Sequence, residues 1–178
     1  MKLVRQLPLV MALGLCATHA FADGTGGDGT VQFTGNVNTQ TCQVTTKDVA
    51  VNLPTVQVQA LGAAGSTAGM ERFAIQLSGC AHGDNDMKKV AAAFSNPEFD
   101  ATTGNLVNTT KDGAKGVEVQ LLNTDGSLIA VNDPATSNSV TIGDDGNAVI
   151  PYMARYYATD KVSEGKVTAN STFTLSYQ

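Results

Sequence analysis

The chain has 178 residues, of which 42% are hydrophobic and 15% charged, with 11 basic residues against 16 acidic ones. This acidic balance does not favour binding to nucleic acid or to an anionic membrane surface, because both are polyanions. The length suits one domain that buries a sizeable core.

The first 22 residues have the layout of a secretory signal peptide. Lys2 and Arg5 form a basic start, an apolar run follows over residues 7–17, and residues 20–22 read Ala-Phe-Ala, a small-x-small cleavage site. The apolar run is too short to span a bilayer. We therefore expect cleavage after Ala22. No later segment approaches the ~20 apolar residues of a membrane helix, so we expect no membrane insertion.

Beyond the leader, residues 23–30 contain four glycines and predict a flexible lead-in. The chain then alternates between apolar and polar residues, which is the pattern of β-strands. The predicted strands are 31–37, 49–53, 56–58, 73–77, 90–94, 117–121, 140–142, 150–156 and 167–178. Turn clusters rich in Gly, Asn, Asp and Ser separate them at 62–69, 96–116 and 132–147. Residues 60–64 suit one helical turn at most, so the pattern predicts an all-β, two-sheet antiparallel sandwich of immunoglobulin-like type.

Two cysteines remain after cleavage, Cys42 and Cys80. An even count in an exported chain predicts one disulfide. A zinc site needs about four ligands, whereas the mature chain offers these two cysteines and His82. We expect no metal and no cofactor.

Residues that carry catalytic chemistry are sparse. His82 lies in a polar loop after a predicted strand, beside Asp84 and Asp86, but the twelve-residue calcium loop is missing. No Gly-x-Ser-x-Gly, phosphate-binding or zinc-protease motif is present. Asn108 and Asn170 each begin an Asn-x-Ser/Thr pattern, which often arises by chance. The sequence therefore predicts that the protein is not an enzyme.

The last predicted strand reaches the end of the chain, where domains usually fray. Phe173, Leu175 and Tyr177 place apolar side chains on one face of it. Two interpretations stay open at this point. The segment is either an ordinary core strand or a strand whose backbone and alternate side chains are also recognised by a partner.

Five segments, in order along the chain, carry a family resemblance. They are Gly-Thr-Val-Gln-Phe-Thr-Gly-Asn-Val at 29–37 followed by Thr-Cys-Gln-Val at 41–44, Phe-Ala-Ile-Gln-Leu-Ser-Gly-Cys at 73–80, Gly-Val-Glu-Val-Gln-Leu-Leu at 116–122, Ala-Arg-Tyr-Tyr-Ala at 154–158, and the penultimate Tyr177 with Gly165 fourteenth from the end. With these segments, the leader and the cysteine pair, the whole mature chain resembles the pilin subunits of chaperone–usher fimbriae. The likeness is closest to the type 1 major fimbrial subunit family.

The resemblance implies an incomplete immunoglobulin-like β-sandwich, completed by a donor strand from a neighbouring subunit. It implies a signal peptide at 1–22, an N-terminal donor-strand extension at 23–35 and a pilin domain at 36–178. It also implies three kinds of partner. A periplasmic chaperone first fills the groove left by the missing strand. At the outer-membrane usher, the extension of an identical or related pilin subunit then replaces the chaperone.

The resemblance assigns roles to particular residues. The donor-strand residues it implies are Gly29, Val31, Phe33 and Gly35. The residues it implies for the acceptor groove and chaperone recognition are Gly165, Phe173, Leu175, Tyr177 and Gln178. Glycine in a strand interior marks either a close approach or a bulge, and both interpretations of Gly35 stay open.

The function implied is a structural subunit of a surface fimbria, exported through the periplasm to the bacterial cell surface, that supports adhesion. The alternative is a minor adaptor or a carbohydrate-binding fimbrial subunit, although two-domain tip adhesins are longer than this chain. A hydrolase on a sandwich scaffold lacks candidate residues.

Overall fold

The structure is a computed structural model that describes residues 32, 42–81 and 87–178. The predicted leader, His82 and the predicted donor residues Gly29, Val31, Phe33 and Gly35 lie outside the described residues. The chain divides into Met1–Asn36 and Val37–Gln178, and every element that the structure describes belongs to the second unit. Within the described ranges, no helix is long and apolar enough to cross a bilayer.

The described part of the chain is built almost entirely from β-strands, as predicted. The strands are β1 (Gln43–Val44), β2 (Thr67–Ser78), β3 (Lys89–Ser95), β4 (Leu106–Val107), β5 (Val117–Asn123), β6 (Leu128–Ile129), β7 (Val140–Thr141), β8 (Ala148–Ala158) and β9 (Thr172–Tyr177). Two short 3-10 helices complete the elements, η1 (Val58–Leu61) and η2 (Pro134–Thr136).

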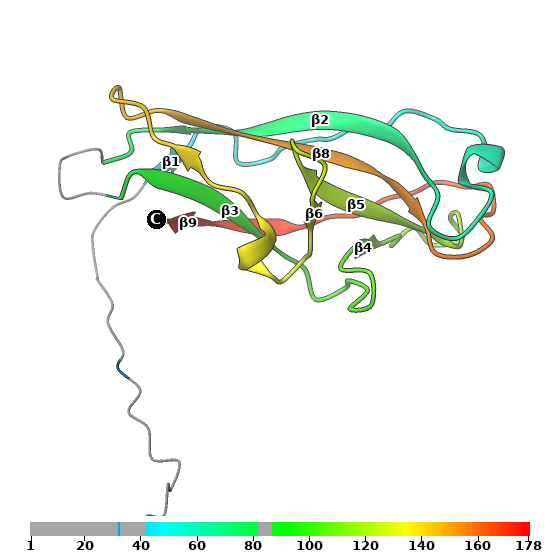
Figure 1. Cartoon of the computed structure of the whole chain (residues 1–178). Coiled ribbons are helices and arrows are strands. Elements are labelled where there is room, and N and C mark those ends of the chain that lie inside the picture. Colours follow the sequence, from blue (N-terminus) through cyan, green and yellow to red (C-terminus); the bar gives the residue numbers. More distant parts are fainter. Residues whose placement is uncertain (1–31, 33–41, 82–86) are drawn as a thin grey trace, which may run out of the picture. The chain divides into compact units, whose positions relative to one another are not determined.

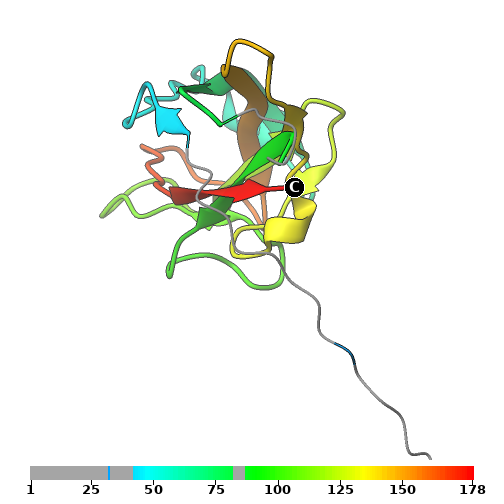
Figure 2. The ribbon, with the colours of Figure 1, turned by 90° about the vertical axis from the view of Figure 1, so that its left-hand side faces the viewer.

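These strands form two antiparallel sheets that pack face to face. The first sheet has the order β1-β2-β8-β5-β4, with β6 beside β5, and the second has the order β7-β3-β9. Figure 1 shows β2 and β8 as one layer above β3 and β9, and Figure 2 shows β3 and β9 side by side from the end of the molecule. The last strand, β9, is therefore at the edge of its sheet.

The core lies between the two sheets, where the inward-facing residues of β2, β3 and β8 meet. Ile75 and Ile150 are each 1% exposed and Val90 is fully buried. Tyr152, also 1% exposed, packs edge-on against Phe94 with ring centroids 5.1 Å apart. At the end of β2, Ile75 and Leu77 are buried and Gln76 is exposed, as the alternating sequence pattern predicts, whereas β3 and β8 also bury consecutive residues, at 90–92 and 152–154.

One polar group in this core links the two sheets. The hydroxyl of Tyr152 on β8 accepts a hydrogen bond from the backbone N–H of Ala92 on β3 (3.0 Å) and bonds the Ser137 hydroxyl (2.9 Å). Burial raises the pKa of this tyrosine. The hydroxyl is satisfied on both sides, so its burial does not leave an unpaired polar group in the core.

Several predicted elements differ from the structure. Residues 49–53 are extended but form no strand, and η1 begins where the predicted strand 56–58 ends. Residues 46–56 make no backbone–backbone hydrogen bond to any described residue, and a strand requires such a partner. The predicted strand 167–178 shortens to β9, because residues 167–171 contact the loop 108–116 and do not pair with a strand among the described residues. The predicted turn cluster 96–116 contains the two-residue strand β4, and β6 was not predicted at all.

Cys42 and Cys80 form the predicted disulfide, with an S–S distance of 2.07 Å. The bond joins the residue before β1 to the end of β2, so it fastens the start of the extended segment 43–58 to the first sheet. Cys80 is 3% exposed and belongs to the core cluster.

Candidate functional site

A groove runs between two extended segments, residues 44–58 and residues 162–173. Its middle is a hollow of about 500 Å³ between residues 49–53 and 166–171. A second hollow, of about 660 Å³, adjoins it through Val49 and Ser171. A third, of about 380 Å³, adjoins it through Tyr156, Lys166 and Val167. As residue numbers rise along one side they fall along the other, so the two sides of the groove are antiparallel.

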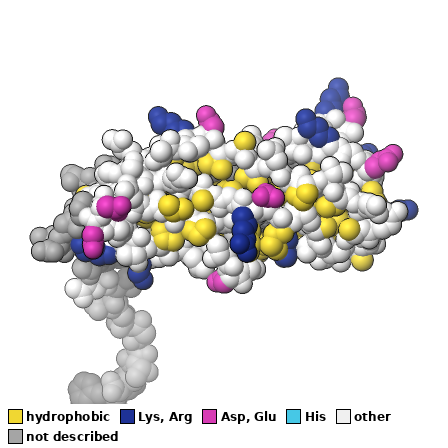
Figure 3. Space-filling view, turned by 90° about the horizontal axis from the view of Figure 1, so that it is seen from above, with side chains coloured by type: hydrophobic (Ala, Val, Ile, Leu, Met, Phe, Trp, Pro, Cys, Tyr) yellow, Lys and Arg dark blue, Asp and Glu magenta, His cyan; other side chains and the backbone are white. Residues whose placement is uncertain are grey.

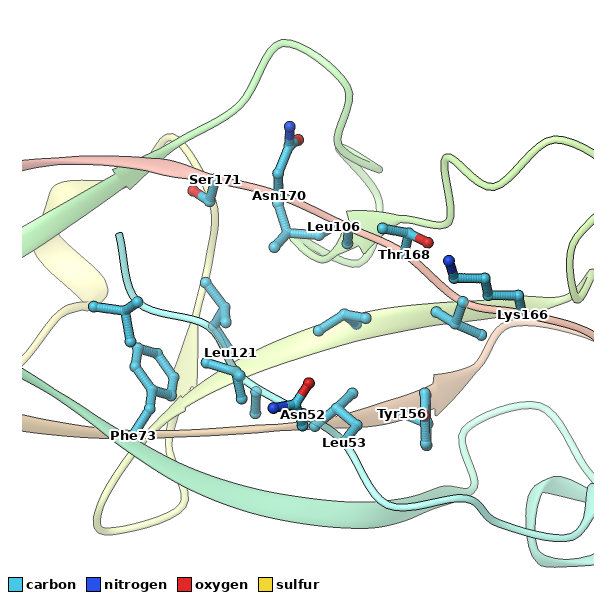
Figure 4. Close-up of a pocket in the computed structure, with 16 residues that line it drawn as sticks. Asn52, Leu53, Phe73, Leu106, Leu121, Tyr156, Lys166, Thr168, Asn170 and Ser171 are labelled. Carbon is cyan, nitrogen blue, oxygen red and sulfur yellow. The ribbon is translucent and has the colours of Figure 1, made fainter. Parts of the chain in front are cut away.

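The first sheet supplies the floor of the groove, which is largely apolar. The floor residues are Phe73 of β2, Leu106 of β4, Val119 and Leu121 of β5, and Ala154 and Tyr156 of β8. Figure 4 shows Leu121 between the segment that carries Asn52 and Leu53 and the segment that runs from Lys166 to Ser171. Phe73, Val119 and Tyr156 remain half-buried, although Phe73 and Val119 pack against the main core. The core is thus open along the groove.

One edge of β9 faces the groove without a strand partner among the described residues. Gln178 and Lys89 exchange two backbone hydrogen bonds, both 2.9 Å long. Because hydrogen-bonded residues alternate in an antiparallel pair, the even-numbered residues of β9 bond to β3 and the odd-numbered ones point to the free edge. Phe173, Leu175 and Tyr177 therefore present N–H and C=O groups there that have no strand partner among the described residues.

The same odd-numbered residues carry the apolar side chains of β9. Phe173, Leu175 and Tyr177 are half-buried and pack against the core cluster. A fully covered core strand would bury them, as β8 does with Ile150. The last strand thus offers free backbone groups and incompletely covered apolar side chains along the same track, which is what an added strand requires.

The other predicted acceptor residues lie along the same rim, with different local roles. The Tyr177 hydroxyl accepts a hydrogen bond from the backbone N–H of Cys42 (2.8 Å), which connects the end of β9 to the opposite rim. Gln178 pairs with Lys89 of β3. Gly165 lines the 380 Å³ hollow with φ +150°, and a Cβ there would collide with the backbone nitrogen of Ala114. A close crossing of two backbones thus accounts for this glycine.

Residue-by-residue reading of the sequence missed the opposite rim and the floor. Val49, Val51 and Leu53 were predicted as a strand but not as groove residues, and they line the middle hollow half-buried. Their alternation ahead of Pro54 was the available signal. The floor residues had none, because they come from four strands that the chain brings together only on folding.

One buried carboxyl group lies behind the floor of the groove. Glu118 is 6% exposed, and its carboxylate accepts hydrogen bonds from Thr103 Oγ1 (2.8 Å) and Asn105 Nδ2 (3.1 Å). Burial raises the pKa of Glu118, and its nearby partner Asp100 raises it further. The backbone N–H of Thr102 lowers the pKa of Asp100. In the part of the chain that the structure describes, no three His, Cys, Asp or Glu side chains gather in a possible metal site.

Figure 3 shows charged side chains scattered singly over one face, with hydrophobic side chains running between them among uncharged surface. This distribution contains no basic stripe of the kind that nucleic-acid binding uses on that face.

Comparison with solved structures defines the class of fold. The P pilus rod subunit PapA matches with a TM-score of 0.62 and 21% identity, over 77% of this chain and 99% of that one. A structure of a chaperone–usher pilus, solved to explain rod uncoiling, also matches with a TM-score of 0.62, at 20% identity over 86% of this chain and 97% of that one. The fold is therefore the incomplete immunoglobulin-like sandwich of these pilins.

Sequence comparison then gives the family. The model of the Fimbrial family, described as "Fimbrial protein", matches residues 31–178, so the chain belongs to this family of structural proteins. The F17 fimbrial protein of Escherichia coli is 39% identical over 93% of this chain and 96% of its own. The major fimbrial subunit SMF-1 of Stenotrophomonas maltophilia is 38% identical over 84% and 92%. The type-1 fimbrial protein A chain of E. coli K12 is 34% identical over 98% and 99%.

Proposed function

We propose that this chain is the structural subunit of a surface fimbria that polymerises by donor-strand exchange. The observation that carries the proposal is the edge of β9, where Phe173, Leu175 and Tyr177 have free backbone groups and half-buried side chains beside an apolar groove. Membership of the fimbrial protein family supports the same function.

The donor in this proposal is the N-terminal extension, residues 23–35, of the next subunit. Its alternating residues are Gly29, Val31, Phe33 and Gly35. Alone in water, a strand with one apolar edge buries nothing. Inserted in the groove, it satisfies the open edge of β9 and covers the floor, and full burial of each large apolar side chain contributes roughly 1.5–3 kcal/mol.

The empty groove explains why such a subunit needs partners before it joins a fibre. An exposed apolar edge promotes uncontrolled strand pairing between chains. We infer that a periplasmic chaperone covers the groove first, and that the outer-membrane usher is where the next subunit's extension replaces it. The groove and the Cys42–Cys80 disulfide both suit this exported route, since disulfides persist in oxidising compartments.

The major shaft subunit is the role that the relatives favour. One relative is named a major fimbrial subunit and another the A chain of a type 1 fimbria, and this chain covers nearly the whole of each. The fibre displays its subunits on the cell surface and supports adhesion. A minor adaptor or carbohydrate-binding subunit remains the alternative, and it is tested by whether fibres disappear when the chain is absent.

Deletion of residues 23–34 tests the donor assignment. The truncated subunit keeps every described strand, so we expect it to bind its chaperone but not to enter fibres, as judged by co-purification and electron microscopy. Deletion of the glycine-rich residues 23–28 alone is the matched control and should leave assembly largely intact. Normal fibres built from the longer deletion would contradict the proposal.

A further inference from the structure

The rim that carries β9 is supported in two different ways along its length. Thr172–Tyr177 pair with β3. Residues 166–171, which line the middle of the groove, have no strand partner within the described ranges. The loop 108–116, between β4 and β5, holds this half of the rim instead.

The side chain of Asn108 makes the densest set of contacts between the loop and the rim. Its Nδ2 donates to the carbonyl oxygens of Ala114 (2.8 Å) and Lys166 (3.0 Å). Its Oδ1 accepts from the backbone N–H groups of Thr110 (3.0 Å) and Thr168 (2.9 Å). One side chain thus bonds two residues of the loop and two residues of the rim.

Backbone bonds extend the same contact. The N–H of Thr109 donates to the carbonyl of Thr168 (2.9 Å), and the N–H of Ala114 donates to the carbonyl of Lys166 (3.0 Å). Both polar backbone groups of Thr168 therefore face the loop. In an extended chain the neighbouring residues face the other way, so the backbone groups of Val167 and Ala169 face the groove.

Two glycines allow this close approach. A Cβ on Gly113 would collide with the carbonyl oxygen of Lys166, and a Cβ on Gly165 would collide with the backbone nitrogen of Ala114. The loop and the rim therefore meet backbone to backbone, at a distance that a larger residue in either position would prevent.

We propose that Asn108 is a positioning residue of the acceptor groove. It holds residues 166–168 extended, with Val167 facing the groove, before any donor strand arrives. This inference rests on the proposed function. Without Asn108, this half of the rim would have to be ordered at the moment of binding, and such ordering slows or weakens association.

The same contacts give a structural role to the Asn108-Thr109-Thr110 sequence pattern. Both amide hydrogens of Asn108 are engaged by carbonyl oxygens, and the Thr110 hydroxyl bonds the Thr168 hydroxyl (2.7 Å). The pattern that resembles a glycosylation site is thus used to bind the loop to the rim.

The experiment measures how fast the mature chain, residues 23–178, takes up a fluorescent synthetic peptide of residues 23–36, supplied in excess. Asn108→Ala should slow uptake by about tenfold for each rim residue that must now be ordered on binding. Amide exchange in the loaded complex should speed up at Val167 and Ala169 but not at Leu175, which β3 supports independently.

Asn123→Ala is the matched control. Asn123 is 1% exposed and its side chain makes three hydrogen bonds between loops, but it does not line the groove. It should lower the melting temperature at least as much as Asn108→Ala while leaving the uptake rate unchanged. If Asn108→Ala does not fold, Thr110→Val, which removes the hydroxyl contact with Thr168, should slow uptake about twofold, as loss of a weak hydrogen bond would.

The outcomes separate the two proposals. A wild-type chain that takes up no peptide would contradict the proposed function itself. If the wild type takes up the peptide and Asn108→Ala takes it up as fast as Asn123→Ala does, the positioning role alone is overturned. Where Thr110→Val is measured instead, an uptake rate equal to that of the wild type has the same meaning. Slower uptake that is confined to the Asn108 and Thr110 variants would support it.

Discussion

The two sides of this sandwich use the same alternating pattern with different results. Between β2, β3 and β8, inward-facing residues such as Ile75 and Ile150 are 1% exposed. Along β9, inward-facing Phe173, Leu175 and Tyr177 remain half-buried. The difference lies in the neighbouring strands, because in the described part of the chain β8 is paired on both edges and β9 on one. Burial in a sheet protein is thus decided by pairing as well as by residue type.

The comparison has a functional consequence. The closed side, formed by β2, β3 and β8, supplies the stability of the isolated subunit. On the proposed function, the open side, formed by β9 and the groove, would add stability only when another strand binds. A chain built in this way gains part of its folding free energy on assembly. Variants on the closed side should therefore act on the subunit alone, and variants on the open side should act mainly on the assembled form.

The largest expected effect is at the disulfide that fastens the open rim to the closed sheet. Replacing both Cys42 and Cys80 with Ala should lower the free energy of unfolding by about 4 kcal/mol, the chain-entropy value for a sequence separation of 38. Urea denaturation checks this, with the wild type under thiol reduction as the control. An unchanged midpoint would mean that the rim does not depend on the tether.

A pair of core truncations compares the two sides directly. Ile150→Ala should cost about 2–5 kcal/mol with or without donor peptide, because its site is fully enclosed. Leu175→Ala should cost less in the empty subunit, where the side chain is half-buried, and more once a donor covers it. The measurement is urea denaturation with and without the peptide of residues 23–36. Equal costs for the two variants in the empty subunit would refute the distinction.

Glu118 lies at the boundary between the two sides, because it is next to Val119 of the groove floor on β5. A substitution there tests how a buried carboxyl group at this boundary affects stability. Burial raises its pKa, so the folded state binds the proton more tightly than the unfolded state does. Its contribution to stability therefore falls as pH rises from the ordinary pKa of a glutamate, 4.5, through the raised pKa of the folded state. Glu118→Gln stays neutral and keeps an acceptor oxygen for Thr103 and Asn105.

We expect the stability of Glu118→Gln relative to the wild type to be higher at pH 7 than at pH 4. This difference should be smaller than the stability losses caused by the core truncations. Chemical denaturation at the two pH values measures the gain. Glu71→Gln, at an exposed position of β2, is the control. If the free energy of unfolding changes with pH in the same way for the wild type and Glu118→Gln, the buried carboxyl group does not contribute to the pH dependence of stability.

The sequence predicted the closed side well and the open side poorly, for a physical reason. Strands such as β2 and β8 are long and paired, so a period of two is visible in them. The strands β4 and β6 have two residues each, which is too short to show any period. The alternation at 49–53 was visible, but no sequence pattern states whether a segment finds a pairing partner.

The candidate site divides in the same way. The residues of the last strand were identified through the family resemblance, and the structure gives their place at a free edge. The support of that edge by Asn108 depends on contacts between residues 58 and 60 positions apart, and nothing local in the sequence indicates them. The role of Gly165 as a backbone crossing likewise depends on Ala114, far away along the chain.

The central claim is that the free edge of β9 receives a strand from another copy of this chain. The most direct test is amide hydrogen exchange, residue by residue, before and after the peptide of residues 23–36 is added. Exchange should slow at Phe173, Leu175 and Tyr177, whose N–H groups face the groove, and stay the same at Thr174 and Ser176, which already bond to β3. Slowing that is equal at odd and even positions, or absent from both, would contradict the account.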